Sequence, residues 1–276
     1  MLSTLGDACL QVGDWLLGWL LLLPTDLALI LVALGTSAIL VLVRLVATDQ
    51  NLLARCRQDK TRLRELIRAA KRASDKGAVQ RYQATFSTIS LKALKSEWKP
   101  LLVSLIPMAF VTVWCLARLE FHPPKEGDLV ELRSYFPASS IGQVAHVVPQ
   151  PGIDAVDGWI RKIDEDPAPG PDGSANGLAI WKLRAAAQKT PYDLIIRHAG
   201  ESRNRRLLVG ARHYAPAIEL YDDGGRQLGS EVVMRPIQLF GMIPGIPALA
   251  FPPWLVAYLL IAIPFVWVFK RACGIF

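Results

Sequence analysis

The sequence predicts an α-helical membrane protein with three transmembrane helices and a cytoplasmic coiled-coil hairpin, joined to a mostly β extracytoplasmic domain. Three observations predict this fold. The chain of 276 residues is 52% hydrophobic and contains three long apolar segments. Residues 44–99 carry 14 Lys and Arg against 5 Asp and Glu, whereas residues 122–247 carry 14 against 15. The second of these stretches also contains short strand-like runs bounded by turn residues.

The charge asymmetry predicts the orientation of the chain. Short loops rich in Lys and Arg stay on the cytoplasmic side of a membrane. We therefore expect residues 48–99 inside the cell and residues 122–238 outside it. The N-terminus is then outside, and the tail of residues 272–276 lies in the cytoplasm. A multi-pass protein of the cell inner (cytoplasmic) membrane follows from this orientation.

The three predicted spans are residues 25–47, 100–118 and 254–271. The second and third are short, but basic and aromatic residues at their ends favour the membrane interfaces. Residues 1–24 contain an apolar run of only about nine residues, which is too short to cross a bilayer. We interpret residues 1–24 as an outer interfacial helix, the alternative being a span continuous with the first one.

Residues 48–99 are predicted to form two antiparallel helices. Apolar residues recur at three-and-four spacing through residues 51–73 and again through residues 79–93. The run of residues 74–77 is predicted to be the turn, with Gly77 supplying the positive φ that commonly ends a helix. Two apolar stripes joined by a short turn are typical of a helical hairpin.

The domain of residues 122–238 is predicted to be a small β structure with one short helix at residues 178–188. An apolar, proline-rich segment, residues 239–253, is expected to lie at the outer membrane interface. The predicted strands are residues 129–136, 144–148, 194–197, 206–209 and 217–221, with turn signals at 151–152, 169–173 and 223–225.

No sequence motif indicates catalysis. GxSxG, HExxH, P-loop and GxGxxG patterns are missing, and the four cysteines and four histidines show no metal-ligand spacing. The acidic run of residues 164–166 is interpreted as a solvated loop rather than a calcium site, and Arg203, Arg205 and Arg206 as the tip of a hairpin. We therefore expect no enzyme activity, no cofactor, no metal and no binding of DNA.

Polar residues inside two of the spans are candidates for function, because the membrane interior makes them costly. Two polar stripes of this kind are able to line a groove that opens to the cytoplasm. The alternative is that the hydroxyl groups bond to their own backbone and aid helix packing, while the arginine extends to the headgroups. The residues are Thr36, Ser37 and Arg44 on the first span, and Ser104, Met108 and Thr112 on the second.

The order of these parts resembles the YidC/Oxa/Alb3 membrane insertase superfamily, above all its archaeal YidC-like branch and the third subunit of the endoplasmic reticulum membrane protein complex. The resemblance rests on Asp49-Gln50 after the first span, on the stretch LKALKSEWKPLLVSLIPM at residues 91–108, and on the apolar tail that ends in Lys270-Arg271. It covers residues 27–118 and 240–276, and the β domain between them lies outside it.

This resemblance implies an insertase or chaperone that moves client segments into the bilayer through a polar groove. In that interpretation Arg44 attracts acidic client segments, and the other five polar residues line the groove. Nascent or client membrane proteins, membrane lipids, and a ribosome or translocon are the implied partners. The hairpin would contact a partner or the ribosome through Arg62, Arg68, Lys71, Arg72, Lys76 and Arg81. The alternative is a non-inserting anchor or assembly factor whose β domain binds an unknown partner.

Overall fold

Five α-helices and two antiparallel β-sheets make up the protein in the computed structural model, which describes residues 2–47, 50–168, 176–221 and 224–274. Three helical stretches are long and apolar enough to cross a membrane: Thr25–Ala47, Leu101–Arg118 and Pro253–Ala272. The predicted combination of long apolar helices with a β region is therefore confirmed. The helices are α1 (Leu2–Leu17), η1 (Gly18–Leu22), α2 (Thr25–Ala47), α3 (Gln50–Arg72), α4 (Lys76–Arg118) and α5 (Pro253–Ala272).

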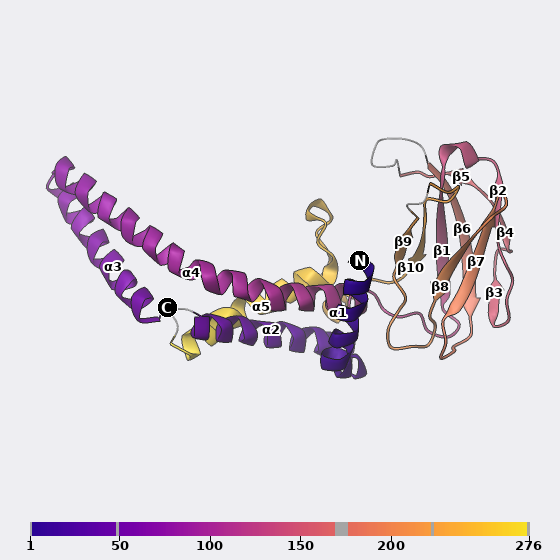
Figure 1. Cartoon of the computed structure of the whole chain (residues 1–276), viewed down its shortest axis with the longest axis horizontal. Coiled ribbons are helices and arrows are strands. Elements are labelled where there is room, and N and C mark those ends of the chain that lie inside the picture. Colours follow the sequence, from indigo (N-terminus) through magenta and orange to yellow (C-terminus); the bar gives the residue numbers. More distant parts are fainter. Residues whose placement is uncertain (1, 48–49, 169–175, 222–223, 275–276) are drawn as a thin grey trace.

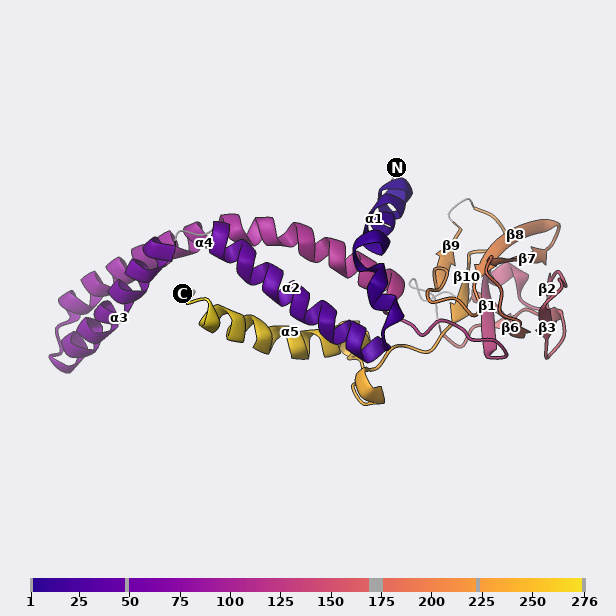
Figure 2. The same ribbon diagram turned by 90° about the horizontal axis from the view of Figure 1, so that it is seen from below.

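Helix α2 is the centre of the helical bundle. It contacts both α4 and α5, and it lies between them in Figure 2. Its buried side includes Leu29 and Ala33, which pack in one cluster with Trp254 and Ala257 of α5 and Trp114 of α4. Small residues at such a contact let two helix backbones approach closely. Helix α1 runs across one end of this bundle instead of parallel to it (Figure 2).

Helices α3 and α4 form the predicted hairpin, which extends from the other end of the bundle (Figure 1). Cys56 and Ala93 are buried between the two helices. The predicted role of Gly77 in the turn is wrong. Ser74 has the positive φ, at 54°, and Gly77 lies within α4. Asp75 caps α4 by accepting a hydrogen bond of 2.9 Å from the backbone N–H of Ala78, so the helix begins before the glycine.

Helix α4 is continuous over 43 residues, from the hairpin turn to the end of the second apolar stretch. The sequence analysis divides this region at Pro100. The structure instead carries one helix through that position, giving a length of about 65 Å at a rise of 1.5 Å per residue. The second helix of the hairpin and the second apolar stretch are thus parts of the same helix.

The β region lies at the end of the bundle opposite the hairpin (Figure 1). One sheet has the strand order β3-β6-β1-β10-β9, with β5 also paired to β6, and the other has the order β4-β2-β7-β8. The strands are β1 (Leu129–Pro137), β2 (Val144–Val147), β3 (Ile153–Ala155), β4 (Ile160–Lys162), β5 (Asp164–Glu165), β6 (Asn176–Ala185), β7 (Tyr192–His198), β8 (Glu201–Leu207), β9 (Ile218–Leu220) and β10 (Gly229–Val233).

The core of the β region comes from alternate residues of both sheets. Leu132 of β1 and Trp181 of β6 are fully buried and oppose each other in register, and Leu194 and Ile196 of β7 enter the same cluster. The indole Nε1 of Trp181 donates a hydrogen bond of 2.9 Å to the carbonyl oxygen of Trp159. The buried indole therefore has the polar partner that it needs.

Two predictions in this region are wrong. The helix expected at residues 178–188 is largely strand β6, because every second residue from Gly177 to Ala185 is buried and both edges of the strand are paired. Arg203, Arg205 and Arg206 lie on strand β8 instead of at a hairpin tip. The strand reverses direction before them, at residues 199–200, where Ala199 and Gly200 have positive φ.

The acidic run and three of the predicted turn or hairpin positions remain to be placed. Asp164 and Glu165 form the exposed strand β5, and the described residues include no group of three or more His, Cys, Asp or Glu arranged to hold a metal ion. The turn signal at residues 169–173, Asp223 in the following turn signal, and Asp49 at the start of the hairpin lie outside the described residues.

We expect Leu132→Ala to lower the free energy of unfolding of the β region by about 2–5 kcal/mol, because it removes buried methyl groups and leaves a cavity. The measurement is denaturant unfolding of the full chain in detergent, followed by near-ultraviolet circular dichroism. Leu220→Ala is the matched control, since Leu220 of β9 is exposed. Equal effects of the two substitutions would contradict the assigned core.

Candidate functional site

The predicted groove residues of the first span lie in the interface between α2 and α5. Thr36 and Ser37 are buried. The Tyr258 hydroxyl of α5 donates a 3.0 Å hydrogen bond to Thr36 Oγ1, which itself donates to the carbonyl oxygen of Val32 at 2.8 Å. Ser37 Oγ lies 2.6 Å from the carbonyl oxygen of Ala33 and 3.2 Å from that of Ala262 on α5. Both hydroxyl groups therefore join helices together.

The predicted residues of the second span lie on α4. Ser104 and Met108 are half-buried, and Thr112 is exposed. Ser104 Oγ donates to the carbonyl oxygen of Leu101 at 2.8 Å, within its own helix. Arg44 is half-buried in the last turn of α2. The structure thus separates the six residues into a pair engaged with α5, a set along α4, and Arg44.

The apolar stretch of α4 is covered far less than that of α2. Only 11% of its residues are buried, against 33% for α2. The two buried residues, Trp114 and Cys115, lie near its C-terminal end, whereas Leu105 and Ile106 in its first half are exposed. The first half of the stretch, where Ser104 lies, is therefore largely uncovered by protein.

The basic residues of the hairpin remain available to a partner. All six predicted contact residues have exposed side chains and are distributed over α3 and the start of α4. Cys56 and Ala93 are buried in the seam between the helices, whereas Leu91 and Leu94 are exposed. The hairpin therefore presents a solvated, positively charged surface.

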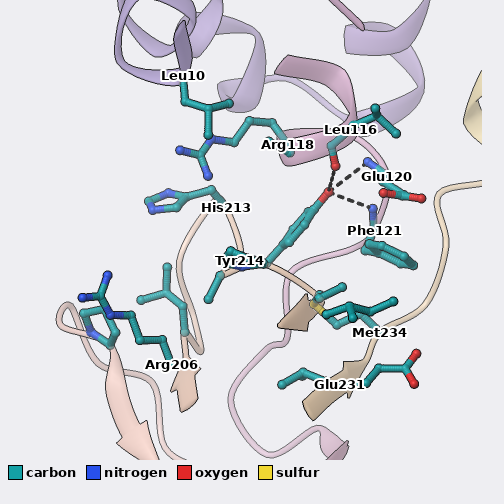
Figure 3. A pocket seen from close by; sticks show the side chains of 18 of the residues that line it. Leu10, Leu116, Arg118, Glu120, Phe121, Arg206, His213, Tyr214, Glu231 and Met234 are labelled. Atoms are coloured by element: carbon teal, nitrogen blue, oxygen red, sulfur yellow. Dashed lines mark hydrogen bonds between the residues drawn. The ribbon is translucent and has the colours of Figure 1, made fainter. Parts of the chain in front are cut away.

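A second candidate site, which the sequence analysis missed, joins α4 to the β region. Tyr214 lies in the loop between β8 and β9 and is buried. Its hydroxyl donates to the carbonyl oxygen of Leu116 at 3.1 Å and accepts from the backbone N–H groups of Glu120 and Phe121 at 3.1 and 3.3 Å (Figure 3). One side chain of the β region thereby binds the backbone on both sides of the end of α4.

A cavity of about 690 Å³ surrounds this contact. Leu10, Leu116, Phe121 and Met234 contribute apolar side chains to its wall, and Arg206 is among its polar residues (Figure 3). Burial raises the pKa of Tyr214 to about 12, so its hydroxyl keeps its proton at neutral pH. With that proton donated to a backbone carbonyl, the hydroxyl acts as a structural connector.

Above the cavity, Asp14 connects α1 to α4. Its carboxylate accepts hydrogen bonds from Arg118 Nε and Nη2 at 3.0 and 2.8 Å, and from Trp114 Nε1 at 2.9 Å. Arg118, and to a smaller extent Trp114, hold the pKa of Asp14 below its ordinary value against the opposing effect of burial. The neighbouring His213 has a lowered pKa, because it is partly buried and lies near the Arg118 charge.

The contacts of Tyr214 and Asp14 are not predicted by the periodicity of the sequence. Asp14 and Arg118 are 104 positions apart, and Tyr214 stands in a loop without regular spacing. The one usable signal is Asp14 itself, a charged residue beside an apolar run. Comparison with known proteins adds no name to the site: no protein-family model, no curated protein and no solved structure matches the chain.

We expect the hydroxyl groups of Thr36 and Tyr258 to be energetically coupled. A double-mutant cycle with Thr36→Val and Tyr258→Phe should give a coupling energy of about 0.6 kcal/mol, the usual size of a hydrogen bond between helices in a membrane. Unfolding of the full chain in mixed micelles measures it. The control cycle pairs Tyr258→Phe with Thr112→Val, because Thr112 is exposed on α4. Equal coupling in both cycles would contradict the contact.

We expect Asp14→Asn to reduce the free energy of unfolding at pH 7 by about 1–2 kcal/mol. Loss of one partner from a fully buried ion pair would cost more, but Asp14 and Arg118 are partly exposed to solvent. Because the pKa of Asp14 is lowered in the folded chain, its contribution is complete above the pKa of an unfolded aspartate. That contribution is lost as the pH falls through the lowered pKa.

Unfolding free energies measured from neutral to strongly acidic pH test this dependence. The difference between Asp14→Asn and the unsubstituted chain should shrink with acidification. Asp154→Asn, at an exposed position of β3, is the control and should show little effect at any pH. A difference that stays constant at acidic pH would refute the ion pair as its cause.

Proposed function

We propose that this chain is a membrane protein insertase or chaperone, in which client segments enter the bilayer beside the apolar stretch of α4. The observation that carries the proposal is the poor cover of that stretch, of which 11% is buried. An uncovered helix face that carries Ser104 and Met108 offers a client both apolar contact and a polar group. Polar groups at such a face reduce the cost of bringing a client's polar backbone into the membrane.

The continuity of α4 supports the same proposal. The second helix of the hairpin, on which Lys76 and Arg81 are exposed, and the uncovered stretch belong to one helix of 43 residues. A client or ribosome bound at the hairpin is therefore held in line with the membrane segment. In this scheme the hairpin is cytoplasmic and the β region extracytoplasmic, as the excess of Lys and Arg in residues 44–99 favours. The membrane is then the cell inner membrane, with the N-terminus outside.

The packing of α2 narrows the set of groove residues. Thr36 and Ser37 use their hydroxyl groups between α2 and α5, so we assign them to holding the bundle together. The proposed groove keeps Ser104, Met108 and Thr112 on α4, with Arg44 at the cytoplasmic end of α2. A positive charge at that end favours acidic client segments.

One observation favours the alternative, a non-inserting anchor or assembly factor. The hydroxyl of Tyr214 fixes the β region to the end of α4 through three backbone groups. Such a connection suits a protein whose β region must be held in one position to bind a partner. In that case the helices serve as the support and the hairpin recruits a second partner.

Reconstitution in vesicles distinguishes the two functions. We expect Arg44→Ala combined with Ser104→Ala to slow insertion of a single-span client with an acidic N-terminal tail by roughly 2- to 5-fold, the effect of losing a partly solvated charge contact. Protection of the client tail from added protease measures insertion. Deletion of residues 126–234 should leave measurable insertion.

Two control variants accompany this experiment. Arg44→Lys combined with Ser104→Thr keeps the charge and the hydroxyl and should insert normally. Lys189→Ala removes an exposed charge from the β region, outside the cavity wall, and should have no effect. Normal insertion by the Arg44→Ala/Ser104→Ala variant, with activity lost only on deletion of the β region, would reject the insertase proposal in favour of the alternative.

A further inference from the structure

A loop between β10 and α5 presents apolar side chains with no protein cover. We name residues 240–252 the proline loop. Phe240 is 60% exposed, Met242 75% and Leu249 60%, and Phe251 is also exposed. Apolar residues that gather on a surface in this way indicate a contact with a membrane or with another protein.

Charge is missing from the whole neighbourhood of this loop in the sequence. Between Arg235 and Lys270 the chain contains no Asp, Glu, Lys or Arg. This uncharged stretch includes the proline loop and runs without interruption into α5, which begins at Pro253. The loop is therefore a direct continuation of a helix that is apolar enough to cross a membrane.

Part of the loop's backbone is hydrogen-bonded within the loop itself. The N–H of Ile246 donates to the carbonyl oxygen of Phe251 at 2.9 Å, and the N–H of Phe251 donates back at 3.1 Å. Between them, the N–H groups of Leu249 and Ala250 bond to the carbonyl oxygens of Ile246 and Pro247. The prolines at 244, 247 and 252 have no N–H to satisfy. Each polar group that is paired in this way, or absent as in proline, lowers the cost of placing the loop in an apolar medium.

The base of the loop is fixed to the bundle. Leu239 is buried in the cluster that holds α2 and α5 together, and the N–H of Phe240 donates a 2.9 Å hydrogen bond to Asp26 Oδ1 in the first turn of α2. The loop then projects sideways from the end of the bundle nearest the β region (Figures 1 and 2). Helix α1 projects from the same end on the opposite side (Figure 2).

We propose that the proline loop is a lipid-binding anchor, whose tip around Leu249 inserts into the membrane leaflet nearest the β region. The acyl and glycerol portions of the phospholipids are its ligand. Helix α1, with Trp15 83% exposed, is the corresponding contact on the opposite side of the bundle. Tryptophan is favoured at this level of a bilayer. The two together hold the β region at a fixed height above that leaflet.

The position and the chemistry of the proline loop favour lipid over a protein as its ligand. The loop leaves the bundle at the end of a membrane-length helix, where lipid is the surrounding medium, and it offers no charge for recognising a particular partner. This inference does not depend on the insertase proposal, because an anchor protein would need the same contact.

Site-specific photocrosslinking in the full chain tests whether the proline loop contacts lipid. A diazirine amino acid replaces Leu249, and the full chain is reconstituted in vesicles of phosphatidylethanolamine and phosphatidylglycerol, illuminated and examined by mass spectrometry. We expect a covalent lipid adduct at position 249. The matched control carries the same amino acid at Leu220 of β9, which is 71% exposed against 60% for Leu249, and should give the water adduct.

A water adduct at position 249 would overturn the proposal, and so would a crosslinked dimer, which would show that a second copy covers the loop. As a second measurement, Leu249→Asp should reduce lipid adducts formed from a diazirine at Met242 by several-fold. The same substitution at Leu220 should leave them unchanged. Equal adduct yields in these two variants would also reject an inserted tip.

Discussion

A polar group in apolar surroundings is costly unless it has a hydrogen-bond partner, and most of the buried hydroxyl groups of the helical bundle have one within the protein. This constraint accounts for how α2 and α5 meet. Thr36 and Ser37 each bond to a carbonyl oxygen of their own helix and also to a group on α5, so a single hydroxyl serves both the local backbone and the contact. Among the described residues of α4, Ser104 bonds within its own helix, and the first half of the apolar stretch around it has no buried residue.

The same principle operates where the bundle meets the β region. The C-terminal end of a helix leaves carbonyl groups without partners in the helix. The hydroxyl of Tyr214 donates to one such carbonyl, that of Leu116, and accepts from the N–H groups of Glu120 and Phe121 just after the helix. Asp14 of α1 accepts hydrogen bonds from Arg118 and Trp114 near the same end of α4. Two side chains thus fix the relative positions of α1, α4 and the β region.

Much of the fold follows from local patterns in the sequence. Long apolar runs predict the three membrane-length helices, and three-and-four spacing predicts the hairpin that contains Cys56 and Ala93. Strand β6 is not predicted because the run Ala185-Ala186-Ala187 at and after its end consists of good helix formers. Its burial depends on pairing with β1, 39 to 55 positions away in the sequence. Local preference carries no information about such pairing.

The candidate sites also contain some residues that the sequence identifies and some contacts that only the structure shows. The sequence offers two roles for the hydroxyl groups of the first span, lining a groove or aiding helix packing. The position of α5, which brings Tyr258 to Thr36, favours packing. The contacts of Tyr214 and Asp14 join positions about 100 residues apart and use common residue types. No spacing rule identifies contacts of this kind, because they arise from how separate elements pack.

The unbroken course of α4 has a mechanical consequence. Its cap at Asp75 and its contact with Tyr214 lie at opposite ends of a helix of about 65 Å. A tilt of about 5° over that length displaces one end by about 6 Å relative to the other. A tilt of the hairpin tip is therefore expected to reach the β region as a movement of up to several ångströms, to the extent that Pro100 and Pro107 inside the helix do not bend under it.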